Sequence, residues 1–146
     1  MPVYATNKKA RFDYEILDTL EAGLVLTGQE VKSIRSGQAK LTGGFITFHA
    51  DDAFLINVHV PRYKHAGALL DYKPDRSRKL LLKKKEIDYL RGKIQERGLT
   101  VVPLSFYTKG PHIKVEIGLG RGKKKYDKRV AIKKRDLERE IKRALQ

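Results

Sequence analysis

Hydrophobic and polar residues alternate in several stretches of the chain, and this period of two predicts β-strands. The clearest alternation covers residues 113–119, where Ile, Val and Leu are separated by polar or small residues. Two apolar runs on either side of Ala50-Asp51-Asp52-Ala53 predict a β-hairpin. Pro103 indicates an edge strand or a bulge in its own strand. The predicted strands are one that starts at Phe12, followed by 45–49, 54–60, 99–107 and 113–119.

Two helices are predicted between these strands. Thr27 and Glu30 fit the T-x-x-E capping box, so a helix of about two turns should start at Thr27 and stop near Gly37. A longer helix over residues 84–97 carries one apolar face and is followed by a glycine. Gly92 lies inside it and costs about 1 kcal/mol relative to alanine, which suggests close packing at that point.

The chain of 146 residues is predicted to form one mainly β domain with helices (α+β). A small oligonucleotide-binding-like β-barrel with one short and one longer helix suits a basic protein with aromatic residues in its strands. We expect a flexible basic arm over residues 1–11, the barrel body over 12–120 and a basic tail over 121–146. A loose helical stripe from about Ile132 is too thin to fold alone, so the tail should be disordered when free and helical when bound.

The charge of the chain indicates a polyanionic partner. The formal net charge is +15, and the tail holds 12 Lys and Arg residues against 4 Asp and Glu residues. Each Lys or Arg that neutralises a phosphate releases a condensed counterion, which favours binding to nucleic acid. An anionic membrane is a weaker candidate, because the tail has no Trp or Phe on an apolar face.

Several classes of site have no support in the sequence. The chain has no Cys and no run of 18 apolar residues, and Met1 to Arg11 contains no apolar segment. We therefore expect no disulfide, thiolate metal site, transmembrane helix or secretory signal. The four His residues are scattered and do not have the spacing of metal ligands. These features predict a soluble, cytoplasmic protein without a metal or other cofactor.

An enzymatic function has weak support. Glu30-Val31-Lys32 has the spacing of part of a metal-dependent nuclease motif, with Asp13 or Asp18 as the upstream carboxylate. Such nucleases carry the triplet on a strand, whereas the predicted helix turns Glu30 and Lys32 about 200° apart. No Ser, His and Asp set has local support either. The sequence therefore does not predict an enzyme.

Three groups of residues allow both a structural and an RNA-binding interpretation. Glu30 either caps a helix or accepts hydrogen bonds from exposed base edges. Arg76, Arg78 and Lys79 end an unusually long irregular segment, where they are either solvated or in contact with phosphate. Lys123, Lys124 and Lys125 either belong to a solvated tail or hold the RNA backbone while the ring of the neighbouring Tyr126 stacks on a base.

A series of short motifs runs in order from residue 7 to residue 129. They are Asn7-Lys8-Lys9-Ala10, Asp13-Tyr14, Ala22-Gly23, Gly28-Gln29-Glu30-Val31-Lys32-Ser33, Arg35-x-Gly37, Asp75-Arg76-x-Arg78-Lys79-Leu80-Leu81-Leu82, Glu86-Ile87, Pro103-Leu104, Gly122-Lys123-Lys124 and Asp127-Lys128-Arg129. In this order and spacing the chain resembles the small protein B, or SsrA-binding, family, the partner of transfer-messenger RNA in bacterial ribosome rescue. Beyond Arg129 the similarity is one of composition and helical tendency.

The resemblance implies a mechanism. The body is expected to bind the tRNA-like domain of transfer-messenger RNA and to enter the empty A site of a stalled ribosome as a monomer, with no membrane partner. The tail is expected to lie as a helix in the small-subunit decoding centre and the empty mRNA channel. Translation then switches to the reading frame of the RNA, which encodes a degradation tag.

The resemblance and the charge pattern together select candidate binding residues. For the body they are Asn7, Arg11, Glu30, Lys32, Arg76, Arg78 and Lys79. For the decoding site and the tail they are Gly122, Lys123, Lys124, Lys125, Tyr126, Asp127, Lys128, Arg129 and Leu145. The alternatives are a ribosomal or ribosome-assembly protein that binds ribosomal RNA, and the metal-dependent nuclease.

Overall fold

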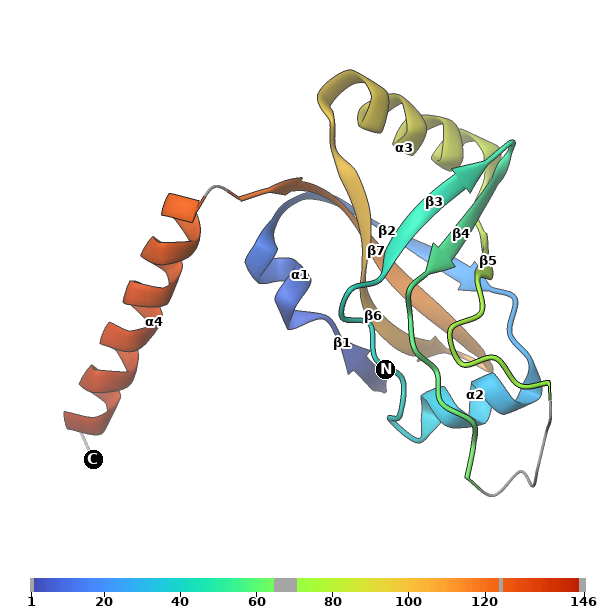
Figure 1. The fold of residues 1–146 in the computed structure, drawn as a ribbon, viewed down its shortest axis with the longest axis horizontal. Helices are drawn as coiled ribbons and strands as arrows, with labels where there is room; N and C mark the ends of the chain where they lie inside the picture. Colours follow the sequence, from blue (N-terminus) through green and yellow to red (C-terminus); the bar gives the residue numbers. More distant parts are fainter. Residues whose placement is uncertain (1, 65–70, 124, 145–146) are drawn as a thin grey trace.

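One antiparallel sheet of seven strands, in the order β1-β6-β7-β2-β5-β4-β3, forms the centre of the molecule (Figure 1). The computed structural model describes residues 2–64, 71–123 and 125–144, except for the side chains of residue 97 and residues 125–131. The strands are β1 (Val3–Thr6), β2 (Tyr14–Leu24), β3 (Phe45–His49), β4 (Asp52–Ile56), β5 (Arg78–Leu81), β6 (Thr100–Lys109) and β7 (His112–Gly122). The helices are α1 (Lys8–Asp13), α2 (Gly28–Arg35), α3 (Lys84–Arg97) and α4 (Lys125–Ala144).

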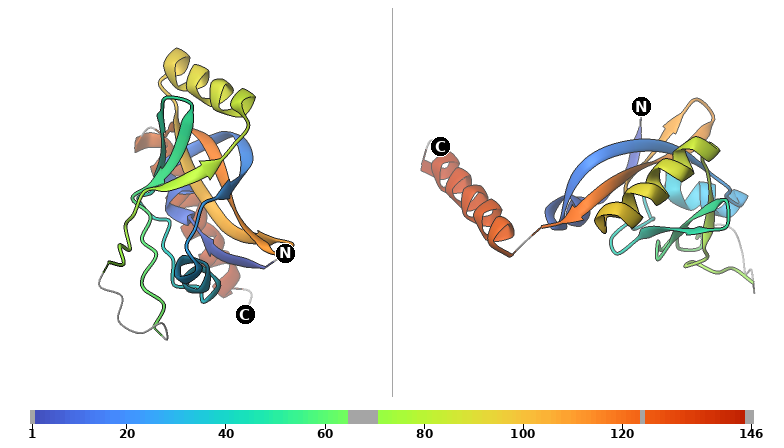
Figure 2. Two further views of the ribbon diagram at one scale, coloured as in Figure 1. Left: turned by 90° about the vertical axis from the view of Figure 1, so that its right-hand side faces the viewer. Right: turned by 90° about the horizontal axis from the view of Figure 1, so that it is seen from above.

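The predicted α+β class is confirmed, but the sheet is not closed into a barrel. Within the described residues β1 and β3 are the end strands, and no ladder joins them. The long strands curve instead, as Figure 2 shows for β2 and β7. The pairing register shifts between Ile16 and Asp18 in β2 and between Pro103 and Ser105 in β6. Such bulges bend a strand and increase its twist, and the predicted irregularity at Pro103 is confirmed.

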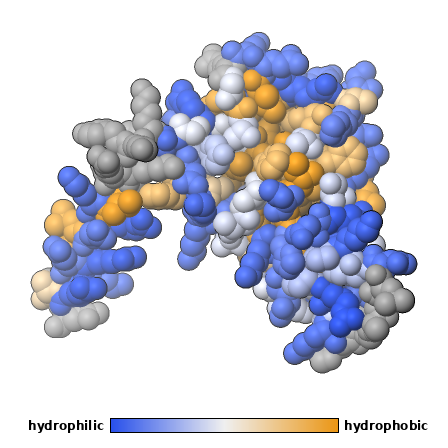
Figure 3. All heavy atoms as spheres, viewed as in Figure 1, coloured by the Kyte–Doolittle hydropathy of each residue, from blue (hydrophilic) through white to orange (hydrophobic). Residues whose placement is uncertain are grey.

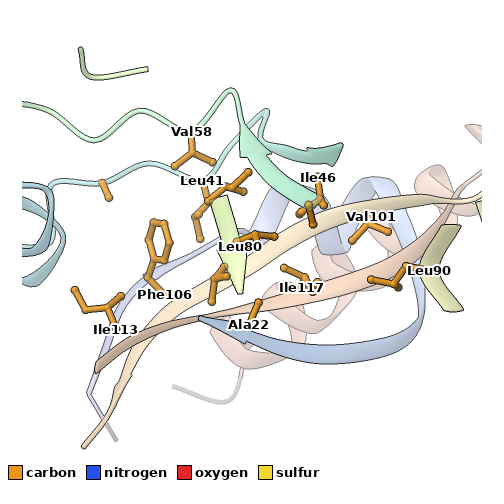
Figure 4. Close-up of a cluster of buried hydrophobic side chains, with 14 of the residues drawn as sticks. Ala22, Leu41, Ile46, Val58, Leu80, Leu90, Val101, Phe106, Ile113 and Ile117 are labelled. Atoms are coloured by element: carbon orange, nitrogen blue, oxygen red, sulfur yellow. The ribbon is translucent and has the colours of Figure 1, made fainter. Parts of the chain in front are cut away.

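The concave side of the sheet encloses the hydrophobic core (Figure 4). The alternation predicted for residues 113–119 is confirmed, because every second side chain of this stretch enters the core. Burying one such side chain contributes about 1.5–3 kcal/mol, so this cluster is the main source of stability. Other core residues from the sheet and α3 are Ala22, Ile46, Leu55, Leu80, Ile87, Leu90, Val101 and Phe106.

Both predicted helices are present. α2 begins after Thr27 with both hydrogen bonds of the capping box. α3 matches the predicted range 84–97 and ends at Gly98, whose φ of 63° is the left-handed conformation that suits glycine. The expected close packing at Gly92 is wrong, because among the described residues no atom outside the backbone of α3 lies within 4 Å of the place that a Cβ would take. No helix among the described residues is long and apolar enough to cross a membrane.

The second strand of the predicted hairpin is shifted. β4 starts at Asp52 and ends at Ile56, whereas the sequence predicts a strand over 54–60. Asn57 has a φ of 59°, which interrupts the extended backbone. Val58 and Val60 remain fully buried beyond this break, so the apolar run reflects core packing and not a longer strand.

The structure corrects the prediction of a flexible arm over residues 1–11. β1 pairs with β6, and α1 follows directly. Asn7 joins the start of α1 to the sheet. Its side chain accepts from Ala10 N at 3.1 Å and donates to Leu41 O at 3.2 Å and to Pro103 O of β6 at 2.9 Å. The basic residues around Asn7 gave no sign in the sequence that its side-chain amide is buried.

We expect Asn7→Asp to lower the free energy of unfolding by about 2–3 kcal/mol, because a carboxylate cannot donate to two buried carbonyl groups. Urea denaturation monitored by circular dichroism measures the change. Asn57→Asp is the matched control, since it makes the same chemical change at an exposed turn. Equal effects of the two substitutions would contradict the assigned role of Asn7.

The boundary between body and tail lies later than predicted. β7 continues to Gly122, which pairs with Tyr14, and Lys123 N donates to Asp13 O at 2.9 Å. α4 then begins at Lys125, before the predicted start near Ile132, and projects from the body (Figures 1 and 2). Outside the described residues lie Lys124 and Leu145, as well as the side chains of Lys125, Tyr126, Asp127, Lys128 and Arg129.

Candidate RNA-binding surface

Glu30 lies at the centre of a buried network at the start of α2. Its Oε1 accepts from Thr27 N at 2.9 Å, which completes the predicted capping box. The same oxygen accepts from Arg76 Nη2 at 2.5 Å, and Oε2 accepts from Arg78 Nε at 2.5 Å. Only 1% of Glu30 is exposed. One carboxylate therefore joins the helix start to the segment before β5.

Arg78 is fully buried, and each side of its guanidinium has a partner. Besides Glu30, it donates through Nη1 to Val58 O at 2.8 Å and through Nη2 to Pro74 O at 2.9 Å. A buried arginine needs such compensation, because an isolated charge in the interior costs several kcal/mol. The pair thus fixes the backbone after β4 and the backbone before β5.

The carboxyl group of Glu30 stays ionised. Burial by itself raises the pKa of this carboxyl, but hydrogen bonds from Arg76, Thr27 N and Arg78 outweigh that effect and hold the pKa below its ordinary value. The segment before β5 is held further by Tyr72, whose hydroxyl donates to Val60 O at 2.6 Å. Near Glu30 the backbone is therefore fixed by both charged and neutral contacts.

These contacts correct the predicted direct RNA contacts of three residues. Asn7, Glu30 and Arg78 are 3% exposed or less, and their polar atoms contact other parts of the chain. A nucleotide cannot reach them unless the body opens. Their contacts hold the folded body together, and for Glu30 these contacts comprise the helix cap and an ion pair that the sequence analysis did not include.

The other body candidates lie at the surface, at separate places. Arg76 is 37% exposed beside Glu30, and Lys79 is 47% exposed with its Nζ 3.4 Å from Asp52. Lys32 is exposed on α2, with its Nζ 5.9 Å from the centre of the Tyr63 ring. Arg11 lies elsewhere, on α1, and donates to Glu116 at 3.0 Å.

A surface that the sequence analysis missed adjoins this network. Val25 and Leu81 are 47% and 56% exposed, and Arg76 Nη2 donates to Val25 O at 3.3 Å. Gly23 is buried beneath Leu81 and Lys114: a Cβ on Gly23 would be 3.2 Å from Leu81 Cβ and 3.6 Å from Lys114 Nζ. We call Gly23, Val25, Arg76, Leu81 and Lys114 the β2–β5 surface. Exposed apolar side chains next to cations make this a candidate interaction site, in which Leu81 and Lys114 cover the backbone at Gly23.

Glu21 borders the β2–β5 surface, because residues two apart on a strand share a face. It accepts hydrogen bonds from the Tyr107 hydroxyl and from Lys109 Nζ. The bond from Tyr107 lowers the pKa of Glu21, against the opposing effect of burial, and nearby Lys114 lowers it further. The surface therefore combines apolar groups, cations and an ionised carboxylate, which suits the bases, phosphates and hydroxyl groups of RNA.

The nuclease alternative loses its proposed metal ligand. Both oxygens of Glu30 are occupied by Thr27, Arg76 and Arg78, so this carboxylate is not available to a metal ion. Among the described residues no group of three or more His, Cys, Asp or Glu side chains has a suitable arrangement for a metal.

Comparison with known proteins identifies the family. The model of the SmpB protein family matches residues 4–146. An SsrA-binding protein from Frankia casuarinae is 54% identical over 141 residues, which cover 97% of this chain and 88% of that protein. An SsrA-binding protein from Acaryochloris marina is 52% identical over 143 residues, 98% of this chain and 93% of that protein.

A solved structure described as "tmRNA-SmpB: a journey to the center of the bacterial ribosome" is also similar. It has a TM-score of 0.70 and 45% sequence identity, with 86% of this chain and 87% of that chain covered. These matches extend over almost the whole chain and confirm the resemblance seen in its motifs. The chain belongs to the SmpB protein family.

Proposed function

We propose that this chain binds SsrA RNA, the transfer-messenger RNA, and acts with it on the bacterial ribosome in trans-translation. The observation that carries the proposal is similarity over nearly the full length to SsrA-binding proteins and to an SmpB structure described with transfer-messenger RNA and the ribosome. The net charge of +15 suits a protein whose partners are RNA. The chain acts as a binding factor in the cytoplasm, where ribosomes work.

Within this function the body holds the tRNA-like domain through the β2–β5 surface. Val25 and Leu81 pack against unstacked bases, while Arg76 and Lys114 contact phosphate. Glu30 and Arg78 do not contact the RNA in this proposal. Glu30 binds Arg78 and Arg76, and Arg76 in turn donates to the carbonyl of Val25, so the network orients Arg76 and Val25 for binding. Asn7 similarly fixes α1 against the sheet.

The tail performs a different task in this proposal. Gly122 and Lys123 end the folded body, and the basic residues after them lead into the small-subunit decoding centre and the empty mRNA channel. In this proposal Tyr126 stacks on a decoding-centre base, with Asp127, Lys128 and Arg129 beside it in the sequence. Lys124 and Lys125 contact RNA phosphates there, and Leu145 acts as an apolar anchor.

The RNA recovered with the protein from bacterial cells tests the proposed function. Sequencing should show transfer-messenger RNA as the dominant small RNA, and a high-salt wash of ribosomes should release the protein. Retention on salt-washed subunits with ribosomal RNA alone would contradict the proposal and favour a permanent ribosomal protein.

Two leucine substitutions locate the RNA-binding surface. Leu81→Asp should reduce the affinity for the RNA by about tenfold or more, because it places a carboxylate and no apolar group against the bases. Leu17→Asp is the matched control: Leu17 is 44% exposed on β2, about 20 Å along the strand from Gly23. Equal affinities of the two variants would place the RNA elsewhere.

A further inference from the structure

The charge of α4 changes along its length. Residues 125–135 contain 6 Lys and Arg residues and 1 Asp residue, a net charge of +5. Residues 136–144 contain 3 cationic and 3 acidic residues, a net charge of zero. A helix that binds only phosphate gains affinity from every cation and loses it with every acid. The last turns of α4 therefore have a composition that differs from an RNA-binding helix.

These last turns carry an exposed apolar stripe. Leu137 and Ile141 are four residues apart and so lie on one side of the helix, with exposures of 57% and 52%. Figure 3 shows hydrophobic groups on α4 between hydrophilic ones. An isolated helix of this length is marginal in water, so an apolar stripe that lacks cover indicates a partner.

Acidic residues border this stripe on both sides. Glu140 is three residues after Leu137, and Glu138 is three residues before Ile141, so the two glutamates neighbour the stripe on opposite edges. The cations of these turns, Arg139, Lys142 and Arg143, lie toward the other side of the helix. One turn earlier the same face is bordered by Lys133 and Lys134 instead.

We propose that residues 136–144 bind a basic protein of the ribosome, through an apolar groove that receives Leu137 and Ile141. Lys or Arg side chains on the rims of that groove would face Glu138 and Glu140. Phosphate groups in the same place would meet two carboxylates, which excludes RNA from this face. The opposite face keeps its cations for RNA, so the end of the tail lies between a protein wall and RNA. This inference rests on the proposed function, which places the tail on the ribosome.

Reversing the charges of Glu138 and Glu140 distinguishes a protein partner from an RNA partner, because the two partners predict opposite effects on ribosome binding. In the full chain with transfer-messenger RNA, Glu138→Lys combined with Glu140→Lys should lower tagging on stalled ribosomes by about tenfold or more. Both residue types are good helix formers, so helix propensity does not change much. If this face contacts RNA, the added cations will strengthen ribosome binding and preserve tagging, which would overturn the proposal.

A photoreactive amino acid in place of Ile141, and in a second chain in place of Lys133, identifies the partner directly. On stalled ribosomes the probe at 141 should label a ribosomal protein, and the probe at 133 should label ribosomal RNA. Labelling of RNA from both positions, or of the chain itself from 141, overturns the inference and leaves the proposed function intact. No label from either probe, with normal binding of transfer-messenger RNA, overturns the placement of the tail on the ribosome and the inference with it.

Discussion

Glu30→Ala should lower the free energy of unfolding by about 3–5 kcal/mol, because it leaves the guanidinium of Arg78 buried without its counter-charge. The substitution also removes the acceptor for Thr27 N and the ion pair to Arg76. For a domain of this size such a loss lowers the melting temperature by about 10 °C or more. Thermal and urea denaturation measure it.

Glu86→Ala is the matched control, since Glu86 occupies the same position in the capping arrangement of α3 and accepts from Lys83 N at 2.9 Å. Among the described side chains Glu86 forms no ion pair with an arginine, so its removal should cost only about 1 kcal/mol. Similar losses for the two variants would mean that the cap, and not the ion pair, carries the contribution of Glu30.

Acid provides a second check on the same group. The pKa of Glu30 is lower in the folded state than its ordinary value of 4.5, so the carboxylate stabilises the fold fully above that value. This stabilisation is lost as the pH falls below 4.5 and through the folded pKa. The difference in stability between the wild-type chain and Glu30→Gln should therefore shrink over that acidic range, whereas a constant difference would assign the effect to packing.

Local patterns predicted those parts of the fold that local interactions determine. The alternation over 113–119 and the period of the helix over 84–97 match β7 and α3 closely, because burial of one face decides each element. The capping box of Thr27 and Glu30 was predicted equally well. The open sheet was not predicted, since closure into a barrel depends on how the end strands meet across the whole sheet.

The site was harder to predict because its contacts join distant segments. Asn7 contacts Leu41 and Pro103, which are far from it in the sequence, and no pattern in the basic residues around Asn7 predicts either contact. A signal for β5 did exist: Arg78 is two residues before Leu80, so strand periodicity directs both inward and Leu81 outward. That reasoning would have predicted a buried arginine in need of a carboxylate, and an exposed leucine beside it.

A chain that ends at Lys123 should lose tagging activity almost completely, because every residue proposed for the mRNA channel is removed. The body should remain folded, since β7 ends at Gly122 and Lys123 keeps its bond to Asp13. Tagging of a truncated reporter protein on stalled ribosomes measures the loss. Substantial tagging by this chain would refute the division of tasks between body and tail.

A full-length chain with the order of residues 125–144 scrambled is the matched control. It keeps the composition and charge of the tail but not the apolar stripe or the position of Tyr126. It should bind transfer-messenger RNA like the wild-type chain and fail in tagging. Normal tagging would show that charge alone is sufficient.

The affinity of the isolated body for RNA shows whether the body alone holds the tRNA-like domain. The dissociation constant of residues 1–123 for the tRNA-like domain of transfer-messenger RNA can be measured by fluorescence anisotropy at about 0.15 M salt, where non-specific attraction of the tail is screened. We expect a value within about threefold of that of the full chain, a difference below about 0.7 kcal/mol. A loss of affinity of about thirtyfold or more, roughly 2 kcal/mol, would show that the tail holds the RNA and would refute the assignment of RNA binding to the body.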